Sequence, residues 1–348
     1  MSPGGAGVDG AVRPVGPGGR RRRATATAAL GGLTLATVVA AVCLGGYPLA
    51  VPGVVETLLG GGSRAEQFVV LDVRLPRVAM AVLVGAALGL AGALMQALLD
   101  NPLASPDIIG ITQGASVGAV TGLLVLGWGG LAVSGAALAG ALIAAAAIHL
   151  LAWRDGVTGQ RFVLIGIAVA FMGQAALGYM LTRADVRDAQ SAWVWLVGSV
   201  GSARWDEIVV LAAALAVLIP IALTRAPALR VLQFGDDAAT GLGVHAHRAR
   251  AGIIAIAVAL AAVGVAAAGP VAFVAFMAAP IARRIAGGGM ALAPAALVGA
   301  VVVAAADLAG RHLLPGDIQV PAGVITGAVG APYLLWLLAT GDRRGRTA

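Results

Sequence analysis

The chain has 348 residues, of which 59% are hydrophobic and only 11% are charged. A soluble domain usually carries about 25% charged residues, and a chain of this size could not bury so much apolar surface. The composition therefore excludes an ordinary soluble protein and indicates a membrane protein. The formal net charge is +7, but the 23 basic residues, all arginine, are scattered between apolar runs. A nucleic-acid-binding protein would gather them on a polar face, so we expect no nucleic-acid partner.

The N-terminal segment, residues 1–24, is rich in glycine, proline and arginine. Such a segment cannot bury a core, so we expect a disordered cytoplasmic tail. Residues 25–341 would then form a single transmembrane domain, and residues 342–348 a second cytoplasmic tail.

The middle of the chain is a series of apolar runs, and a helix needs about 20 apolar residues to cross the hydrocarbon core of a bilayer. Transmembrane β-strands would instead alternate over about ten residues, which these runs do not do. The sequence therefore predicts an all-α, polytopic membrane protein with about ten transmembrane helices. Their expected ranges are 28–50, 78–98, 107–127, 130–152, 162–182, 206–224, 250–268, 271–286, 291–309 and 321–340.

The arginines indicate the orientation of these spans. Ten spans place both termini on the same side of the membrane. With the N-terminal tail inside, 16 of the 23 arginines fall on the cytoplasmic side and 7 fall outside, as the positive-inside rule requires. We therefore expect both termini, and the polar loop at about 228–249, to be cytoplasmic.

Polar residues interrupt the apolar segment 74–120. Pro76 suits a helix start, Gln96 lies inside an apolar run, and Asn101 and Pro102 interrupt the helix before it resumes. Irregular backbone at membrane depth is tolerated only where protein or a water-filled cavity covers it. The interruption is therefore either a cytoplasmic-side turn or part of a pathway wall. Candidate pathway residues are Gln96, Asn101, Pro102 and Gln113.

The loop at 228–249 contains the segment GDDAATGLGV. This segment can form a short helix that ends at Gly243, and Asp236 and Asp237 near its start suit the helix dipole. On the residues alone it is either an ordinary connection or a docking element for a soluble partner.

No catalytic or metal-binding constellation is found in the sequence. His245 and His247 are two residues apart with no nearby cysteine, which favours a solvated pair over a metal site. The chain lacks the glycine-rich phosphate loop of an ATPase, so we expect it to bind no cofactor and to hydrolyse no ATP itself. Asp307 lies four residues before Arg311, a spacing that permits an ion pair on one helix face.

Five motifs in this order resemble the permease family of ATP-driven importers for iron–siderophores, haem and cobalamin: RLPR, GAALGLAGALMQALLDNPLASPDIIGITQGAS, WLVGS, GDDAATGLGV and GPVAFVAF. The resemblance covers most of residues 28–340. It implies a fold like that of the cobalamin-importer permease, with ten transmembrane helices in each subunit, in a bacterial cell membrane. It also implies two permease subunits, two ATPase subunits that bind ATP and Mg, and an extracytoplasmic substrate-binding lipoprotein.

The same resemblance implies two docking sites. The ATPase would contact Gly235, Asp236, Asp237, Ala238, Ala239, Leu242 and Gly243. The binding protein would contact Arg74, Arg77 and Arg311, although arginines at span ends also occur simply because they snorkel to the membrane interface. One departure from the family pattern is Ala279-Pro280, where many relatives have Pro-His or Pro-Gln. The resemblance therefore does not predict the local geometry at these two residues.

The function expected from the resemblance is transport of a ferric siderophore, delivered by the binding protein and driven by the separate ATPase. Cobalamin and haem are alternative substrates. A transporter driven by an ion gradient is a further alternative, but it needs ionisable groups near mid-membrane, and the central parts of the spans contain almost none.

Overall fold

The computed structural model describes residues 17–107, 109–152, 159–312 and 319–341, and every regular element within these ranges is a helix. The predicted all-α fold is confirmed. Residues 1–16 of the expected N-terminal tail, and the expected C-terminal tail at 342–348, lie outside the described ranges. The first helix begins at Pro17, inside the segment that we expected to be a tail.

Within the described residues, each of the ten predicted spans corresponds to a helix, and eight helices are long and apolar enough to cross a membrane. The helices at the other two predicted spans are shorter than these eight. One is α5 (Ile111–Val120), which continues into the π-helical turn η2 (Thr121–Val125), and the other is α13 (Val274–Ala286). The eight long helices are α1 (Pro17–Cys43), α4 (Leu75–Leu98), α6 (Leu131–Ala152), α7 (Gly159–Arg183), α9 (Trp205–Thr224), α12 (Ala246–Ala268), α14 (Leu292–His312) and α15 (Ala322–Gly341).

Pro76 lies in the first turn of α4, as the sequence predicted, but α4 is the last part of a longer helical segment. This segment runs without a break from Arg64 to Leu98, through α3 (Arg64–Gln67), the π-helical segment η1 (Phe68–Arg74) and α4. Proline has no N–H and crowds the carbonyl of the preceding turn, and a π-helical turn directly before Pro76 loosens the backbone there. The 35 residues span about 50 Å, so one end extends beyond a hydrocarbon core of about 30 Å.

Short helices connect the spans and were not expected as separate elements: α2 (Val51–Leu58), α3, α8 (Val186–Val197) and α10 (Ala226–Leu232). The start of α3 is fixed by a capping box, in which the Glu66 N–H donates to Ser63 Oγ (3.3 Å) and the Ser63 N–H donates to Glu66 Oε2 (2.7 Å). The predicted helix near residue 236 is present as α11 (Asp236–Gly241).

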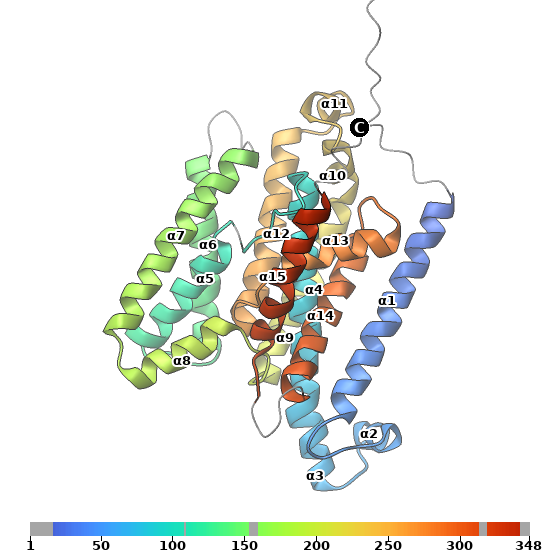
Figure 1. The fold of residues 1–348 in the computed structure, drawn as a ribbon, viewed down its shortest axis with the longest axis vertical. Coiled ribbons are helices and arrows are strands. Elements are labelled where there is room, and N and C mark those ends of the chain that lie inside the picture. The colour runs from blue at the N-terminus through green and yellow to red at the C-terminus, as the bar shows by residue number, and fades with distance from the viewer. Residues whose placement is uncertain (1–16, 108, 153–158, 313–318, 342–348) are drawn as a thin grey trace, which may run out of the picture.

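The bundle is organised around α4, against which α12, α13 and α14 pack (Figure 1). Close approach of backbones makes this possible. At Gly85 a Cβ would overlap the Gly299 carbonyl of α14, and at Gly92 it would overlap the Ala275 carbonyl of α13. Small residues at such crossings are the usual means of packing helices in lipid.

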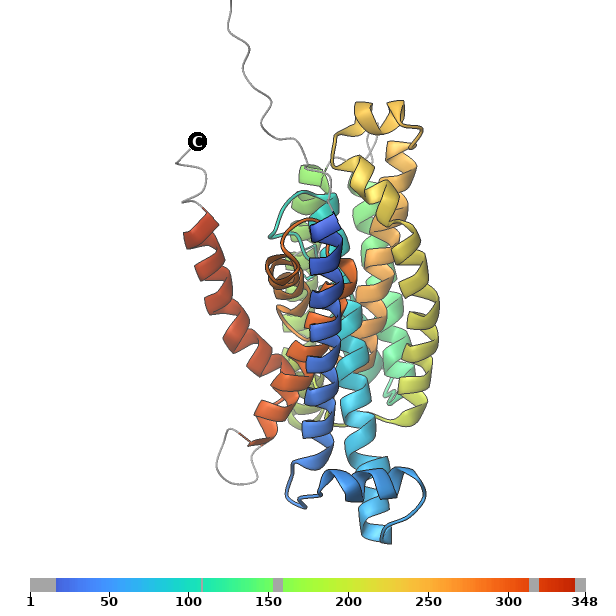
Figure 2. The same ribbon diagram turned by 90° about the vertical axis from the view of Figure 1, so that its right-hand side faces the viewer.

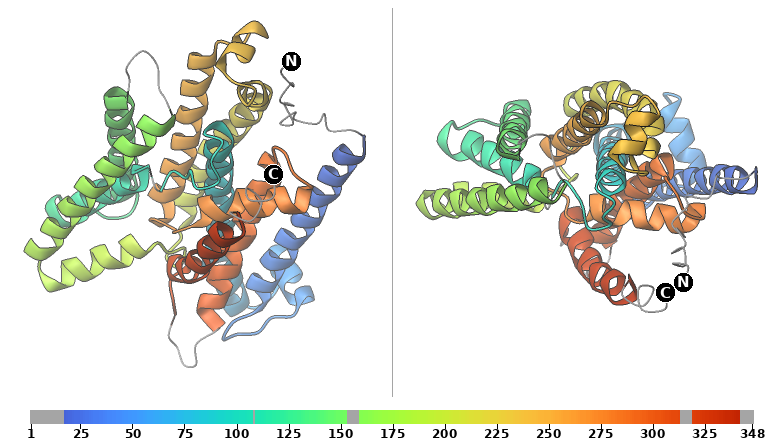
Figure 3. Two further views of the ribbon diagram at one scale, coloured as in Figure 1. Left: turned by 45° about the horizontal axis from the view of Figure 1, so that its top comes forward. Right: turned by 90° about the horizontal axis from the view of Figure 1, so that it is seen from above.

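The other helices are peripheral. Helices α5, α6 and α7 pack together on one side of the core, and α1 lies against α14 on the other (Figures 1 and 3). Helix α15 contacts α14 and α13 but leans away from the bundle (Figure 2). Large apolar side chains on α7 face outward, with Phe171 and Met172 each 71% exposed. The α10–α11 segment and the α2–α3 segment lie at opposite ends of the bundle (Figure 1).

Candidate functional sites at the two ends of the bundle

The loop at residues 226–245 folds into a helical hairpin at one end of the bundle (Figure 1). Between α10 and α11 the chain turns at Gly235, whose φ of 96° favours glycine, and it leaves α11 at Gly243, whose φ is 81°. The Ala239 N–H donates to the Gly235 carbonyl (3.0 Å), and the Val244 N–H donates to the Ala239 carbonyl (2.9 Å). The seven residues expected to dock an ATPase therefore form one compact element.

The side chains of this hairpin divide into an inner and an outer set. Ala239 is fully buried and belongs to the main apolar core, so its side chain faces the protein itself. The other six predicted docking residues are exposed, and Leu242 is 68% exposed. Phe234, which the sequence analysis did not single out, is 54% exposed beside them. The tip thus presents two apolar side chains and two carboxylates outside the membrane spans.

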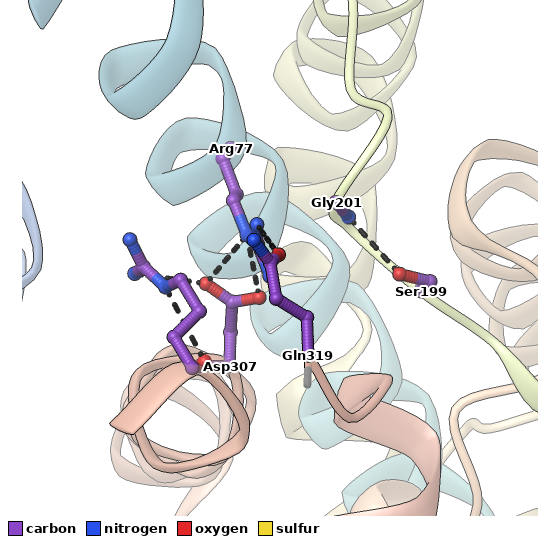
Figure 4. Close-up of polar contacts among 6 residues, drawn as sticks. Arg77, Ser199, Gly201, Asp307 and Gln319 are labelled. Atoms are coloured by element: carbon purple, nitrogen blue, oxygen red, sulfur yellow. Dashed lines mark hydrogen bonds and ion pairs between the residues drawn. The ribbon is translucent and has the colours of Figure 1, made fainter. Parts of the chain in front are cut away.

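At the opposite end, an ion cluster joins α4 to α14 (Figure 4). Arg77 Nε donates to Asp307 Oδ1 (2.8 Å) and Oδ2 (3.1 Å), and Arg77 Nη1 donates to Gln319 Oε1 (2.9 Å). Arg311 Nη2 lies 2.9 Å from Asp307 Oδ2, an ion pair without good hydrogen-bond angles. The predicted pair between Asp307 and Arg311 is confirmed. The bond from Arg77 to Asp307 was not predicted, because the two residues are 230 positions apart in the sequence.

The cluster is more buried than we expected for residues that contact a binding protein. The Asp307 side chain is 2% exposed, and those of Arg77 and Arg311 are each 11% exposed. Two guanidinium groups share one carboxylate, so the cluster keeps a net positive charge near the surface.

Arg74 is not displayed outward. It is 5% exposed, and its guanidinium donates to the carbonyls of Val42 (2.7 Å), Cys43 (3.2 Å) and Tyr47 (2.6 Å). The first two carbonyls belong to the end of α1, where a positive charge complements the helix dipole. The structure therefore gives Arg74 the role of a cap on α1.

Three of the four candidate pathway residues lie around one cavity of about 310 Å³, at the α10–α11 end of α4. Helix α4 ends where Asp100 adopts a φ of 44°, and the Asn101 side chain then accepts a hydrogen bond from the Leu103 N–H (2.9 Å). Polar residues around the cavity include Gln96, Asp100, Asn101, Gln233 and Arg283, and Pro102 also lines it.

Gln113 lies elsewhere. It is on α5, and its amide donates to the Gln174 side-chain oxygen on α7. The structure therefore separates Gln113 from the cavity and places it in the peripheral group of α5, α6 and α7.

The position of Pro280 in α13 explains the role of Gln96. Pro280 lies inside α13 and has no N–H, so the carbonyl four residues earlier, that of Phe276, lacks its normal intrahelical partner. Gln96 Nε2 donates to this carbonyl (2.9 Å), and Gln96 Oε1 accepts from Arg283 Nη2 (2.9 Å). Gln96 is 2% exposed. The Gln96 amide thus replaces the missing hydrogen bond to the Phe276 carbonyl and connects α13 to α4.

The sequence matches the model of the FecCD transport family over residues 33–340. It is 42% identical over 311 residues to the achromobactin transport system permease protein CbrC of Dickeya dadantii, with 88% of each chain covered. It is 37% identical over 301 residues to the ferric enterobactin transport system permease protein FepG of Escherichia coli, covering 86% of this chain and 91% of that protein.

The fold matches a solved structure described as an inward-facing conformation of a metal-chelate type ABC transporter. The TM-score is 0.80 at 25% sequence identity, and the match covers 91% of this chain and 99% of that chain.

Proposed function

Because the chain belongs to the FecCD transport family, we propose that it carries a ferric siderophore across a bacterial cell membrane as one subunit of an ATP-driven importer. The chain is a multi-pass membrane protein and a permease subunit of a siderophore or metal-chelate ABC importer. The siderophore substrate is supported by two relatives, CbrC and FepG, which are permease proteins of an achromobactin transport system and a ferric enterobactin transport system.

A separate ATPase subunit binds ATP and Mg and drives the cycle by pushing on the α10–α11 hairpin. The single observation that carries this proposal is the exposed tip of α11, a short helix outside the spans. Its exposed Phe234 and Leu242 give an apolar contact, and its glycine turns let a partner approach the backbone closely. Asp236 and Asp237 add charge for orientation.

A second permease subunit, either identical or different, completes the pathway, and two ATPase subunits serve the pair. The outward-facing apolar side chains of α7 are available to that subunit or to lipid. Walls of Ala, Gly, Leu and Val with a few amides suit a bulky, enclosed ligand that slides without binding tightly.

An extracytoplasmic binding lipoprotein delivers the ligand to the end of the bundle that carries Asp307. The net positive charge left by Arg77 and Arg311 suits an acidic partner surface. In this arrangement Arg74 contributes indirectly, by fixing the end of α1 beside them. The α11 end is then cytoplasmic, as are both termini.

The proposal is tested by purification of the permease with a candidate ATPase and binding protein. We expect a stable complex whose ATP hydrolysis rises when the loaded binding protein is added. A permease that forms no complex with any ATPase encoded beside it, and whose presence does not change hydrolysis, would contradict the proposal. Ferric siderophore, haem and cobalamin are compared as ligands of the binding protein.

A further inference from the structure

Arg250, in the second turn of α12, contacts two other helices at the cytoplasmic end of the proposed permease. Its Nη2 and Nε donate to Asp236 Oδ1, at 2.8 and 3.1 Å. Its Nη1 donates to the carbonyl of Leu98, the last residue of α4, at 3.4 Å. The Arg250 side chain is only 22% exposed. A single side chain therefore links α11, α12 and α4.

The charges at this junction complement the helix ends that meet there. Asp236 is the first residue of α11, where a negative charge is favoured, and Leu98 lies at the C-terminal end of α4, where a positive charge is favoured. Arg250 supplies the positive charge to both partners at once. A lysine ammonium could replace the charge but not the planar fork that reaches in two directions.

The last turn of α4 continues this connection to the cavity. Gln233, which follows α10, donates to the Ala97 carbonyl at 3.5 Å, a long and weak bond. The adjacent residue, Gln96, holds both the Phe276 carbonyl and Arg283 of α13. Residues 96–98 therefore touch the hairpin on one side and the cavity lining on the other.

We propose that Arg250 is a positioning residue that transmits movement of α11 to the end of α4, and so to the cavity beside Gln96. The inference rests on the proposed ATPase docking at α11. Two side-chain hydrogen bonds reach the end of α4 here, from Arg250 to the Leu98 carbonyl at 3.4 Å and from Gln233 to the Ala97 carbonyl at 3.5 Å. Only the connection through Arg250 also includes a charged pair with α11, at 2.8 Å. Loss of Arg250 should leave the ATPase docked and hydrolysing ATP, while the cavity no longer responds.

The first test measures ATP hydrolysed for each ferric siderophore transported, in liposomes that contain permease, ATPase and binding protein. Arg250→Gln should keep complex assembly but lower transport by about tenfold, within the range of allosteric couplings, while hydrolysis continues. Arg250→Lys should recover part of the loss. The matched control is Arg248→Gln, because the Arg248 side chain is exposed on the same helix and makes no hydrogen bond or ion pair to another described residue.

A second test follows the cavity directly. Cys43 is the only cysteine, so Cys43→Ser gives a background in which Asn101→Cys places a single thiol at the cavity. Its rate of maleimide labelling should change when ATP is added to the complex. Adding Arg250→Gln should abolish that change, whereas adding Arg248→Gln should not. A purely structural role would shift the labelling rate without removing its response to ATP.

Three results would overturn the inference. One is normal transport per ATP by Arg250→Gln, and another is an unchanged labelling response in that variant. The third is failure of correctly folded Arg250→Gln to bind the ATPase, since Arg250 would then serve docking. If the unchanged permease itself fails to bind an ATPase, the proposed function is contradicted, and the inference with it.

Discussion

The two ends of the bundle use charge in opposite ways. At the end that carries Asp307, Arg77 and Arg311 are nearly buried and both pair with the Asp307 carboxylate. At the α11 end, Asp237 and most of its neighbours are exposed, and Asp236, although paired with Arg250, is 47% exposed. Most charge at the first end is used inside the protein, whereas more of the charge at the second end is exposed to a partner. An arginine at a span end therefore shows nothing of its role until its acceptors are known.

The largest expected effect is that of Asp307→Ala, which leaves two nearly buried guanidinium groups without their carboxylate. Breaking a buried pair in this way costs about 3–5 kcal/mol. We expect a large loss of thermal stability in detergent. The matched control is Asp206→Ala, which breaks the exposed pair with Arg204 (67% and 42% exposed) and should cost about 0–1 kcal/mol. Equal losses in the two variants would contradict the structural role given to Asp307.

The next effect compares two neighbouring positions on the hairpin. Ala239→Arg forces a charged side chain into a fully buried site and should lower both stability and ATPase binding. Leu242→Arg changes a side chain that is 68% exposed, so the permease should fold normally but lose its ATPase. Co-purification and detergent melting curves distinguish the two. Retained ATPase binding by Leu242→Arg would argue against docking at this tip.

A smaller effect is expected at Gln96. Gln96→Leu leaves the Phe276 carbonyl and Arg283 without a buried partner, at a cost of about 1–3 kcal/mol. Pro280→Ala restores an N–H to α13 that can reach the Phe276 carbonyl. The cost of Gln96→Leu should therefore be smaller in the Pro280→Ala background, and a double-mutant cycle measures the coupling. Strict additivity would show that Gln96 does not compensate for Pro280.

The smallest expected effect is on affinity for the binding protein, and it distinguishes the role of Arg311 from that of Arg74. Arg311→Gln removes charge from the proposed binding-protein surface. Because the Arg311 side chain is only 11% exposed, its contact with the binding protein should contribute about 1 kcal/mol or less. Affinity for the binding protein should fall a few-fold, and added salt should weaken the unchanged contact. Arg74→Gln should lower stability and leave that affinity unchanged, because its guanidinium is occupied by carbonyls of the α1 end. A larger loss of affinity in Arg74→Gln would reverse these assignments.

Much of the fold can be predicted from the sequence, because the length of each apolar run and the residues that end it are local features. Within the described residues, each of the ten apolar segments corresponds to a helix. The start of α4 at Pro76 was predicted, but the helical segment before it was not, because a π-helical turn has no clear sequence pattern.

The sites were less predictable, because their contacts join residues far apart in the chain. The helix at Asp236 and the pair of Asp307 with Arg311 have local signals of spacing and capping. The bonds from Arg77 to Asp307, from Gln96 to Phe276 and from Arg250 to Asp236 depend on which helices become neighbours. Burial of Ala239 also depends on this packing, since its exposed neighbour Ala238 is the same residue type.

The most direct test of the central claim is uptake of labelled ferric siderophore into liposomes that contain the permease, its ATPase and its binding protein. Haem and cobalamin are assayed in parallel. With ATP on the ATPase side, we predict accumulation that persists when an uncoupler abolishes the proton gradient. Accumulation by the permease alone, driven by a pH or sodium gradient without ATP, would contradict the account.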